Sequence, residues 1–381
     1  MPWREYSVMS RRRELVMFAS DNSNISHLSR RYDISRKTAY KWIKRYIHEG
    51  EEGLSDRSRR PHRSPLKVSE QIEDAVLAVR EDHSTWGGRK IRARLIAIGY
   101  DDVPSASTIT AILHRNGKIS TEESDKHRSW KSFEYEEPND LWQIDFKGHF
   151  SLRNGRCHPL TILDDHLRFS VGLRACTDEK RTTVHSELEN LFNTYGLPER
   201  ILFDNGSPWG GRSRRDYTRL AVWLIRLGIS VIHSRAYHPQ TLGKEERFHR
   251  TLKAELLSGR EFSDIDQLQA SFDSWRECYN FERPHEALNM ATPAQRYRPS
   301  RKEMPKSLPK IEYGPDDHVR KVQANGEIYF RGREFKVGHA FRGEPVAVRP
   351  TMIDGQYKVF YCGEMIKKID LNIVDKIKWK V

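Results

Sequence analysis

The sequence predicts a multidomain protein with N-terminal all-α helix-turn-helix modules, a central α/β domain and a small C-terminal β-barrel. A chain of 381 residues is longer than one hydrophobic core usually organises. The spacing of apolar residues is helical up to about residue 120, mixed from Leu141, and strand-like beyond Pro305. The predicted segments are a helix-turn-helix domain (1–52), a basic linker (53–66), a second helix-turn-helix-like domain (67–120), a linker (121–139), an α/β core (140–300) and a barrel (310–381).

Composition narrows the class of partner. The chain has 66 Lys and Arg against 53 Asp and Glu, a net charge of +13, which favours a polyanion such as nucleic acid over the alternative of a merely basic protein. The four cysteines form no C-x-x-C pair, so neither a disulfide framework nor a sulfur-ligated zinc site is predicted. No signal peptide and no run of eighteen apolar residues is found, and we expect a cytoplasmic protein without a membrane partner.

The first module is predicted from three short helices within residues 11–50. The last two are separated by the turn Asp33-Ile34-Ser35, as in a helix-turn-helix whose final helix enters the DNA groove. An ordinary helical bundle with solvated charges is the alternative. The expected DNA contacts are the polar and basic residues that begin the final helix: Arg36, Lys37, Thr38, Tyr40 and Lys41.

The following segment, 53–66, is rich in Arg, Ser and Pro and poor in residues that could form a core. It is predicted either to lie in a minor groove through Arg59, Arg60 and Arg63 or to be a plain solvated tether.

A second helical module is predicted over residues 68–119. It has an amphipathic helix over 68–82, a break at Trp86-Gly87-Gly88, a helix over 91–98 and a helix from the N-cap Ser105 to Leu113. The pattern resembles a weaker helix-turn-helix, and Arg89 and Lys90 are its expected DNA contacts.

From Leu141 the pattern predicts three strands, over 142–146, 158–163 and 168–173, with Asn154-Gly155 as a hairpin turn. A helix (178–195), a strand (200–203), a helix (216–227), a strand (229–233) and helices over 244–257 and 264–281 follow. Three meandering strands followed by alternating helices and strands are the element order of the ribonuclease H fold. Six short strands between 319 and 369 predict the C-terminal barrel.

Three acidic residues on separate elements form the candidate metal site. Asp145 lies within the first strand, Asp204 just past the fourth, and Glu246 at the start of the helix after the fifth. A carboxylate inside Trp-Gln-Ile-Asp-Phe is costly unless it is paired or binds a metal. Carboxylates without His or Cys partners point to magnesium or manganese.

Four blocks in this order carry a resemblance: WQIDFKG (142–148), FDNGSPW (203–209), YHPQTLGKEERFHRTLK (237–253) and YNFERPHEALNMATPAQRY (279–297). The core resembles that of bacterial insertion-sequence transposases, the superfamily that includes retroviral integrases. The resemblance implies a ribonuclease H-like catalytic core with an Asp-Asp-Glu triad, two Mg²⁺ or Mn²⁺ ions, cleavage and 3′-hydroxyl strand transfer at transposon ends, double-stranded DNA as substrate, and a homodimer or higher homo-oligomer on DNA. It also implies a bacterial, nucleoid-associated protein.

Carried over by register, Asp145, Asp204 and Glu246 are the catalytic residues and metal ligands. Glu245 is a rival for the third position, although helical spacing puts it on the face of Phe248 and toward the core. The interval from Asp204 to Glu246, positions 205 to 245, is 41 residues, longer than is common in this family. An expanded loop near 208–215 is the predicted cause.

Polar and basic residues beside Glu246 are the expected phosphate contacts: His238, Gln240, Lys244, Arg250 and Lys253. Asp164 and Asp165 are predicted to cap a turn, and His285 has either a packing or a catalytic role. Three functions remain open: an active transposase, a DNA-binding regulator derived from one, and a plain metal-dependent nuclease. The intact triad favours activity, and the DNA-reading modules favour transposition.

Overall fold

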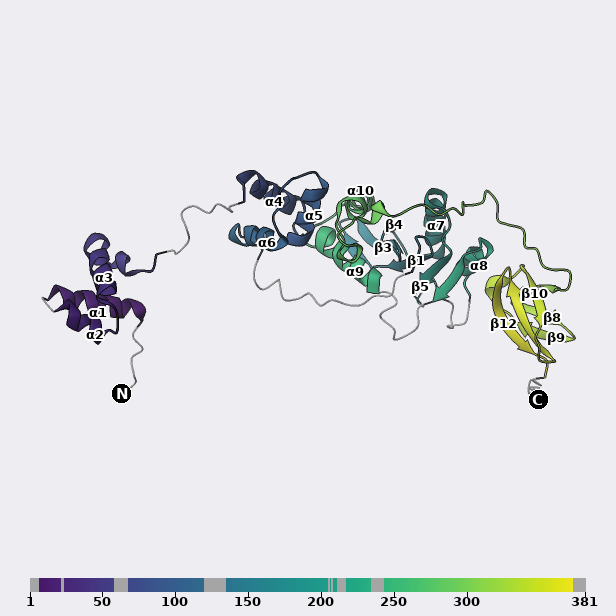
Figure 1. Ribbon diagram of the computed structural model, residues 1–381. Helices are drawn as coiled ribbons and strands as arrows, with labels where there is room; N and C mark the ends of the chain where they lie inside the picture. The colour runs from purple at the N-terminus through teal and green to yellow at the C-terminus, as the bar shows by residue number, and fades with distance from the viewer. Residues whose placement is uncertain are drawn as a thin grey trace. The chain divides into compact units, whose positions relative to one another are not determined.

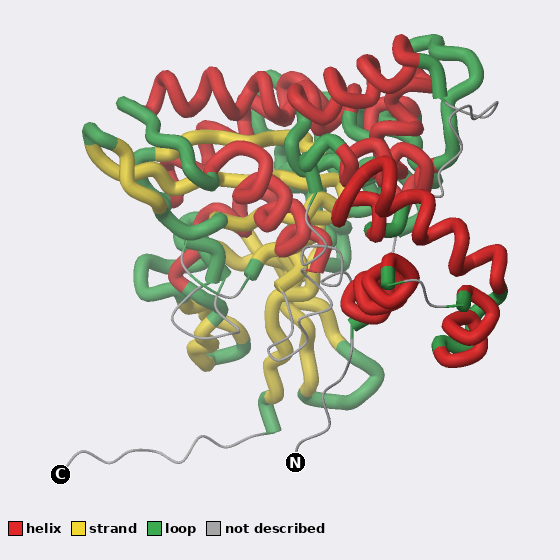
Figure 2. The backbone as a smooth tube through the Cα atoms, turned by 90° about the vertical axis from the view of Figure 1, so that its left-hand side faces the viewer, coloured by secondary structure: helices red, strands yellow, loops and turns green. Residues whose placement is uncertain are grey.

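The computed structural model describes residues 7–21, 24–57, 68–119, 135–204, 206, 208–210, 217–233 and 243–372 (Figure 1). They divide into two compact units, residues 1–67 and residues 68–381. Helices occupy the N-terminal parts, strands and helices the middle, and mainly strands the C-terminal part (Figure 2). No helix among the described residues is long and apolar enough to cross a membrane.

The first unit is a three-helix module, as predicted. It contains α1 (Val8–Ser20), α2 (Ile25–Arg31), α3 (Arg36–Glu49) and the short 3-10 helix η1 (Gly50–Leu54). Asp33 takes a φ of 49° in the predicted turn, and the Ser35 side chain accepts a hydrogen bond from the Thr38 backbone N–H at the start of α3. The hydrophobic core between the three helices includes Leu15, Leu28 and Trp42. The turn and cap therefore fix where α3 begins.

The second helical module contains α4 (Glu70–Asp82), α5 (Gly88–Ala97) and α6 (Ala106–Arg115). Ser105 caps α6 through the Thr108 backbone N–H, as the sequence predicts. Gly88 is buried where α5 meets α6, and a Cβ there would lie 2.3 Å from the Ala106 carbonyl oxygen. A Cβ on the preceding Gly87 would contact nothing within 4 Å.

These two glycines give a matched test of the packing. Gly88→Ala should destabilise the α4–α6 module by about 1–3 kcal/mol, because α5 must move away from the backbone of α6. Gly87→Ala should change its stability by less than about 0.5 kcal/mol. Thermal unfolding and limited proteolysis of the full chain measure both. Equal stability of the two variants would contradict the close approach of α5 and α6.

The central sheet has the strand order expected of a ribonuclease H-like fold. Its strands are β1 (Leu141–Phe146), β2 (Phe150–Leu152), β3 (Gly155–Asp164), β4 (Ser170–Cys176), β5 (Arg200–Phe203) and β6 (Ser230–His233). They lie in the order β4, β3, β1, β5, β6, and β2 pairs with the start of β3 across the predicted turn. The first strands pair antiparallel, whereas β1, β5 and β6 are parallel. The carboxyl ends of β1 and β5 therefore share one edge.

Helices cover both faces of this sheet. One face packs against α7 (Arg181–Tyr195) and α8 (Arg219–Arg226), with Trp142 and Ile144 of β1 in that cluster. The other packs against α9 (Gly243–Leu252) and α10 (Ile265–Glu277), each continued by a π-helical turn, η4 (Lys253–Leu257) and η5 (Cys278–Glu282). Side chains alternate along a strand, so Gln143 and Asp145 project toward the α9 face.

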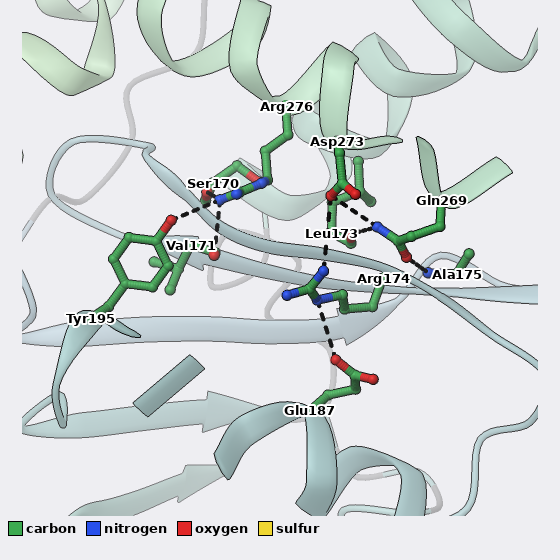
Figure 3. A network of polar contacts seen from close by, with 10 residues as sticks. All are labelled: Ser170, Val171, Leu173, Arg174, Ala175, Glu187, Tyr195, Gln269, Asp273 and Arg276. Atoms are coloured by element: carbon green, nitrogen blue, oxygen red, sulfur yellow. Dashed lines mark hydrogen bonds and ion pairs between the residues drawn. The ribbon is translucent and has the colours of Figure 1, made fainter. Parts of the chain in front are cut away.

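Side chains of α10 cover the free edge of β4 (Figure 3). Gln269 accepts from the Ala175 backbone N–H and donates to the Leu173 carbonyl, at 2.8 and 3.2 Å. Arg276 donates to the carbonyls of Ser170 and Val171 at 3.1 and 3.2 Å. An uncovered edge strand is a site of unwanted pairing, and these contacts satisfy its backbone groups.

Short 3-10 helices, η6 (Glu286–Leu288) and η7 (Pro293–Gln295), follow the core, and η8 (His339–Phe341) lies in the C-terminal part. The C-terminal strands are β7 (His318–Lys321), β8 (Glu327–Phe330), β9 (Arg333–Lys336), β10 (Pro345–Pro350), β11 (Gln356–Tyr361) and β12 (Glu364–Asp370). The predicted closed β-barrel is not confirmed, because they form two open sheets, β12-β11-β10-β7 and β8-β9. Alternating hydrophobicity correctly predicts each strand and its buried face, but it does not specify which edges pair.

Candidate active site

Asp145 and Asp204 are placed side by side by the pairing of β1 with β5. Ile144 lies opposite Phe203 in this parallel pair, so each aspartate is the next residue along its strand. Neighbouring strands lie about 4.8 Å apart. Asp145 is partly buried, with 27% of its side chain exposed, and a carboxylate oxygen of Asp204 accepts a hydrogen bond from the Gly206 backbone N–H. Two of the three predicted acidic residues therefore share one sheet edge.

The third acidic residue comes from α9, which packs against β1. The structure places Glu246 in solvent at the start of this helix, whereas Glu245 is 0% exposed. The prediction that Glu245 points into the core is confirmed. The charge of Glu246 acts on Asp145 and raises its pKa, as expected of two nearby carboxylates.

Burial and the charges of nearby carboxylates disfavour the ionised form of Asp145. Its pKa is raised to about 7, first by burial, then by the charge of Asp204, with smaller contributions from Glu179 and Glu246. A divalent cation relieves this cost, since it favours the ionised form of every carboxylate around it. The donor set is oxygen only, which is the set that magnesium and manganese prefer. These residues therefore fit a hard divalent cation.

The three acidic residues do not close into one cluster in this structure. Among the described residues, the one His/Cys/Asp/Glu group with three possible ligand atoms within 4.8 Å of one another is His83, Cys278 and Glu282. The three predicted ligands do not meet that spacing. Mutual repulsion favours such separation.

Two residues near the acidic site were missed by the sequence analysis, His249 and Thr161. His249 Nδ1 lies 4.0 Å from a carboxylate oxygen of Asp145, and its Nε2 lies 2.8 Å from the Thr161 hydroxyl. That hydroxyl also donates to a carboxylate oxygen of Glu245 at 3.1 Å. Burial and the charge of Lys147 lower the pKa of His249 to about 4, so it is neutral at pH 7. Its position four residues after Glu245, one helical turn, was the available signal.

A basic surface lies beside the acidic residues, as predicted for Arg250 and Lys253. Both are exposed in the structure. Lys147, which follows β1, is close enough to Lys253 for the two charges to repel, and burial and that repulsion lower the Lys147 pKa. The phosphate contacts of Arg250 and Lys253 stay predictions.

Lys244 is buried, unlike Arg250 and Lys253, so the prediction that it lies on the DNA-binding surface is wrong. Its side chain is 5% exposed, and its ammonium lies 2.7 Å from a carboxylate oxygen of Asp165. It also donates to the Asp165 backbone carbonyl at 2.7 Å. Helical geometry explains this position, because Lys244 lies one turn before Phe248 on the face that packs on the sheet.

The predicted contacts on α3 are mostly accessible. Arg36, Lys37, Tyr40 and Lys41 are exposed at the start of the helix, whereas Thr38 is half-buried and its hydroxyl bonds to that of Ser35 at 2.8 Å. The four exposed residues stay predicted DNA contacts, and Thr38 also has a capping role.

The two predicted contacts on α5 differ in exposure. Arg89 lies 3.4 Å from a Glu286 carboxylate oxygen and is exposed, whereas Lys90 is half-buried. Burial and the charge of Arg283 lower the Lys90 pKa to about 8. The remaining predicted contacts, Arg59, Arg60, Arg63, His238 and Gln240, lie outside the described residues.

The turn role of Asp164 is confirmed. One carboxylate oxygen accepts from the Leu167 backbone N–H at 2.9 Å, and the other accepts from the Asn139 backbone N–H at 2.7 Å. Burial raises the Asp164 pKa to about 6. His285 is buried, and its ring meets the Tyr279 ring edge-on.

Comparison with protein families identifies the domains. Residues 135–239 and 227–293 each match an integrase core domain, and residues 317–375 match the C-terminal domain of IS481 family transposases. The chain therefore contains an integrase core domain and a domain like the C-terminal domain of IS481 family transposases. Residues 11–62 match a helix-turn-helix domain and residues 38–113 a homeodomain-like domain, which agrees with the predicted N-terminal DNA-binding modules.

Individual relatives of this chain are distant. It is 24% identical over 398 residues to the transposase for transposon Tn552 of Staphylococcus aureus, covering 92% of this chain and 80% of that protein. It is 28% identical to the insertion element IS407 uncharacterized 31.7 kDa protein of Burkholderia multivorans, covering 42% of this chain and 55% of that protein. Among solved structures, the HTLV-2 integrase catalytic core domain in complex with magnesium is 16% identical, with a TM-score of 0.32 over 44% of this chain and 99% of that chain.

Proposed function

We propose that this protein cleaves DNA at the ends of its own insertion sequence and joins the resulting 3′-hydroxyl groups to target DNA. The observation that carries the proposal is the convergence of Asp145 and Asp204 at one sheet edge, with Glu246 on the adjoining helix. Divalent ions held there would activate the nucleophile and stabilise the leaving oxygen in a displacement at phosphorus.

The residues of the chain divide this work. Asp145, Asp204 and Glu246 hold the cations. The exposed Arg250 and Lys253 lie one and two helical turns after Glu246 and hold DNA phosphates near them. The N-terminal modules read the terminal inverted repeats, and a homodimer or larger assembly brings two ends together.

Strand joining tests the function directly. Full-length protein, a labelled duplex with the element end and a target plasmid should give joined products in Mg²⁺ or Mn²⁺ and none in EDTA. Cleavage without joining would identify a plain nuclease. Binding without either reaction would identify a regulator that has lost its chemistry.

DNA affinity should fall steeply with salt. Each phosphate that the protein neutralises contributes a slope of about −0.9 to a plot of log K against log salt concentration for duplex DNA. The net charge of +13 and the exposed Arg36, Lys37 and Lys41 predict several such contacts. Fluorescence anisotropy between about 50 and 200 mM salt measures the slope. An affinity independent of salt would contradict the electrostatic basis of DNA binding.

A further inference from the structure

A small basic cavity lies beside the active site, under α9. Its volume is about 50 Å³. One water needs roughly 10–15 Å³ of such volume, so the cavity has room for several waters or one tetrahedral oxyanion. Its lining includes Arg168, Arg247, Arg283, His285 and Tyr279, and none of its described lining residues is acidic.

The positively charged side chains of the cavity come from three separate segments of the chain. Arg247 lies on α9 directly after Glu246, Arg168 ends the turn between β3 and β4, and Arg283 follows η5. Arg168 has a φ of 58° and is 8% exposed. The left-handed region is uncommon for a long side chain, so the turn holds this guanidinium at the cavity at some cost in backbone energy.

The charges repel one another in the absence of an anion. Arg283 has a carboxylate partner, Glu255, at 3.0 Å. Arg247 is exposed and has no ion pair with the described residues, and partial desolvation followed by the charges of Arg168 and Arg250 lowers its pKa. Removing like charges from water is costly unless an opposite charge compensates them. An anion bound in the cavity would provide that compensation.

His285 supplies a second, independent observation. It is 6% exposed, and its Nε2 is buried with no hydrogen-bond partner among the described residues. Its ring is hydrogen-bonded to the backbone of Tyr279, so Nε2 is the nitrogen left for a ligand. Burial and the charges of Arg283, Lys90 and Arg168 lower its pKa, and a bound anion would offset these charges, so that Nε2 takes up a proton and donates to the anion. Buried polar atoms without a partner are rare, and this one lines a cavity.

We propose that this cavity binds a phosphate group, held by Arg247, Arg168 and His285. Guanidinium groups match the oxygens of a phosphate in charge and in fork geometry. The phosphate comes either from the DNA backbone or from free phosphate in solution. A phosphate from the DNA backbone rests on the proposed function, because it would bind at Arg247, the residue that follows the predicted metal ligand Glu246 on the same helix.

The first arm of the test uses inorganic phosphate and the full chain without divalent metal. At equal ionic strength, phosphate should raise the Tm of the wild type relative to chloride by roughly 2–4 °C. Arg247→Gln should lose this shift, because Arg247 has no other ion pair to maintain the fold. His285→Asn should lose most of it while an amide replaces Nδ1 at the Tyr279 backbone. The exposed Arg260→Gln removes the same charge outside the cavity and should retain the full shift.

The second arm measures salt dependence on a 30-base-pair duplex. Arg247→Gln should reduce the slope of log K against log salt by about 0.9, and Arg260→Gln should not. A reduced slope assigns the phosphate to DNA. A Tm shift that Arg247→Gln abolishes, with an unchanged slope, assigns the site to free phosphate. If wild type and Arg247→Gln agree in both arms, the phosphate site is wrong. Neither arm needs catalysis, so that failure leaves the proposed strand joining to its own assay.

Discussion

Glu246→Gln is expected to reduce both DNA cleavage and strand joining in magnesium by about a thousandfold or more, which corresponds to about 4 kcal/mol of transition-state stabilisation. The neutral amide is a weaker ligand for a hard cation than the carboxylate. Asp145→Asn and Asp204→Asn should have the same effect. Single-turnover assays on an element-end duplex measure the loss. Anisotropy in the absence of metal should show nearly unchanged end-binding, because these residues hold cations and not DNA.

Glu245→Gln is the matched control on the neighbouring position. Glu245 is completely buried, and burial followed by the charge of Asp145 raises its pKa well above the usual value. Burial therefore favours its neutral form, and glutamine has nearly the same shape and keeps an oxygen for the Thr161 hydroxyl. We expect less than a tenfold loss of rate. Loss of activity in Glu245→Gln with retention in Glu246→Gln would exchange the two assignments.

The sequence could predict the acidic site because its signals are local. Asp145 and Asp204 each follow an apolar strand, and parallel pairing of those strands brings their ends together. The choice of Glu246 over Glu245 came from the register of the family's block, and the helical repeat puts Glu245 with Phe248 and Leu252 on the core side. The structure shows the parallel pairing of the two strands and the burial of Glu245, and the role of Glu246 as a ligand stays a prediction.

What the sequence did not predict depends on contacts between distant segments. Thr161 and His249 meet from a strand and a helix 88 positions apart, and neither residue type is unusual where it stands. The cavity beside Arg247 needs a turn, a helix and the segment after η5 to come together. The small C-terminal β-barrel is not confirmed for a related reason: hydrophobic alternation does not specify which strand edges pair, and β8 pairs with β9 in a separate sheet.

Lys244→Met should destabilise the catalytic core by about 3–5 kcal/mol, the usual effect of removing one partner of a buried ion pair. The Asp165 side chain is 4% exposed, and methionine would leave its charge without the ammonium at 2.7 Å. Hydrogen bonds from Gln143 and the Tyr135 backbone N–H remain, but they are not a countercharge. Thermal unfolding of the full chain measures the effect.

Lys253→Met, on the same helical segment, is expected to affect DNA binding and not stability, the opposite of Lys244→Met. Lys253 is exposed, so its removal should change stability by less than about 0.5 kcal/mol while it lowers the salt slope of DNA binding by about 0.9. Lys244→Met should leave that slope unchanged under conditions where the core is folded. A stable Lys244→Met variant with a reduced slope would return Lys244 to the DNA surface that its place in the motif first suggested. The two lysines thus separate a charge that builds the active-site helix from one that is free to meet a phosphate.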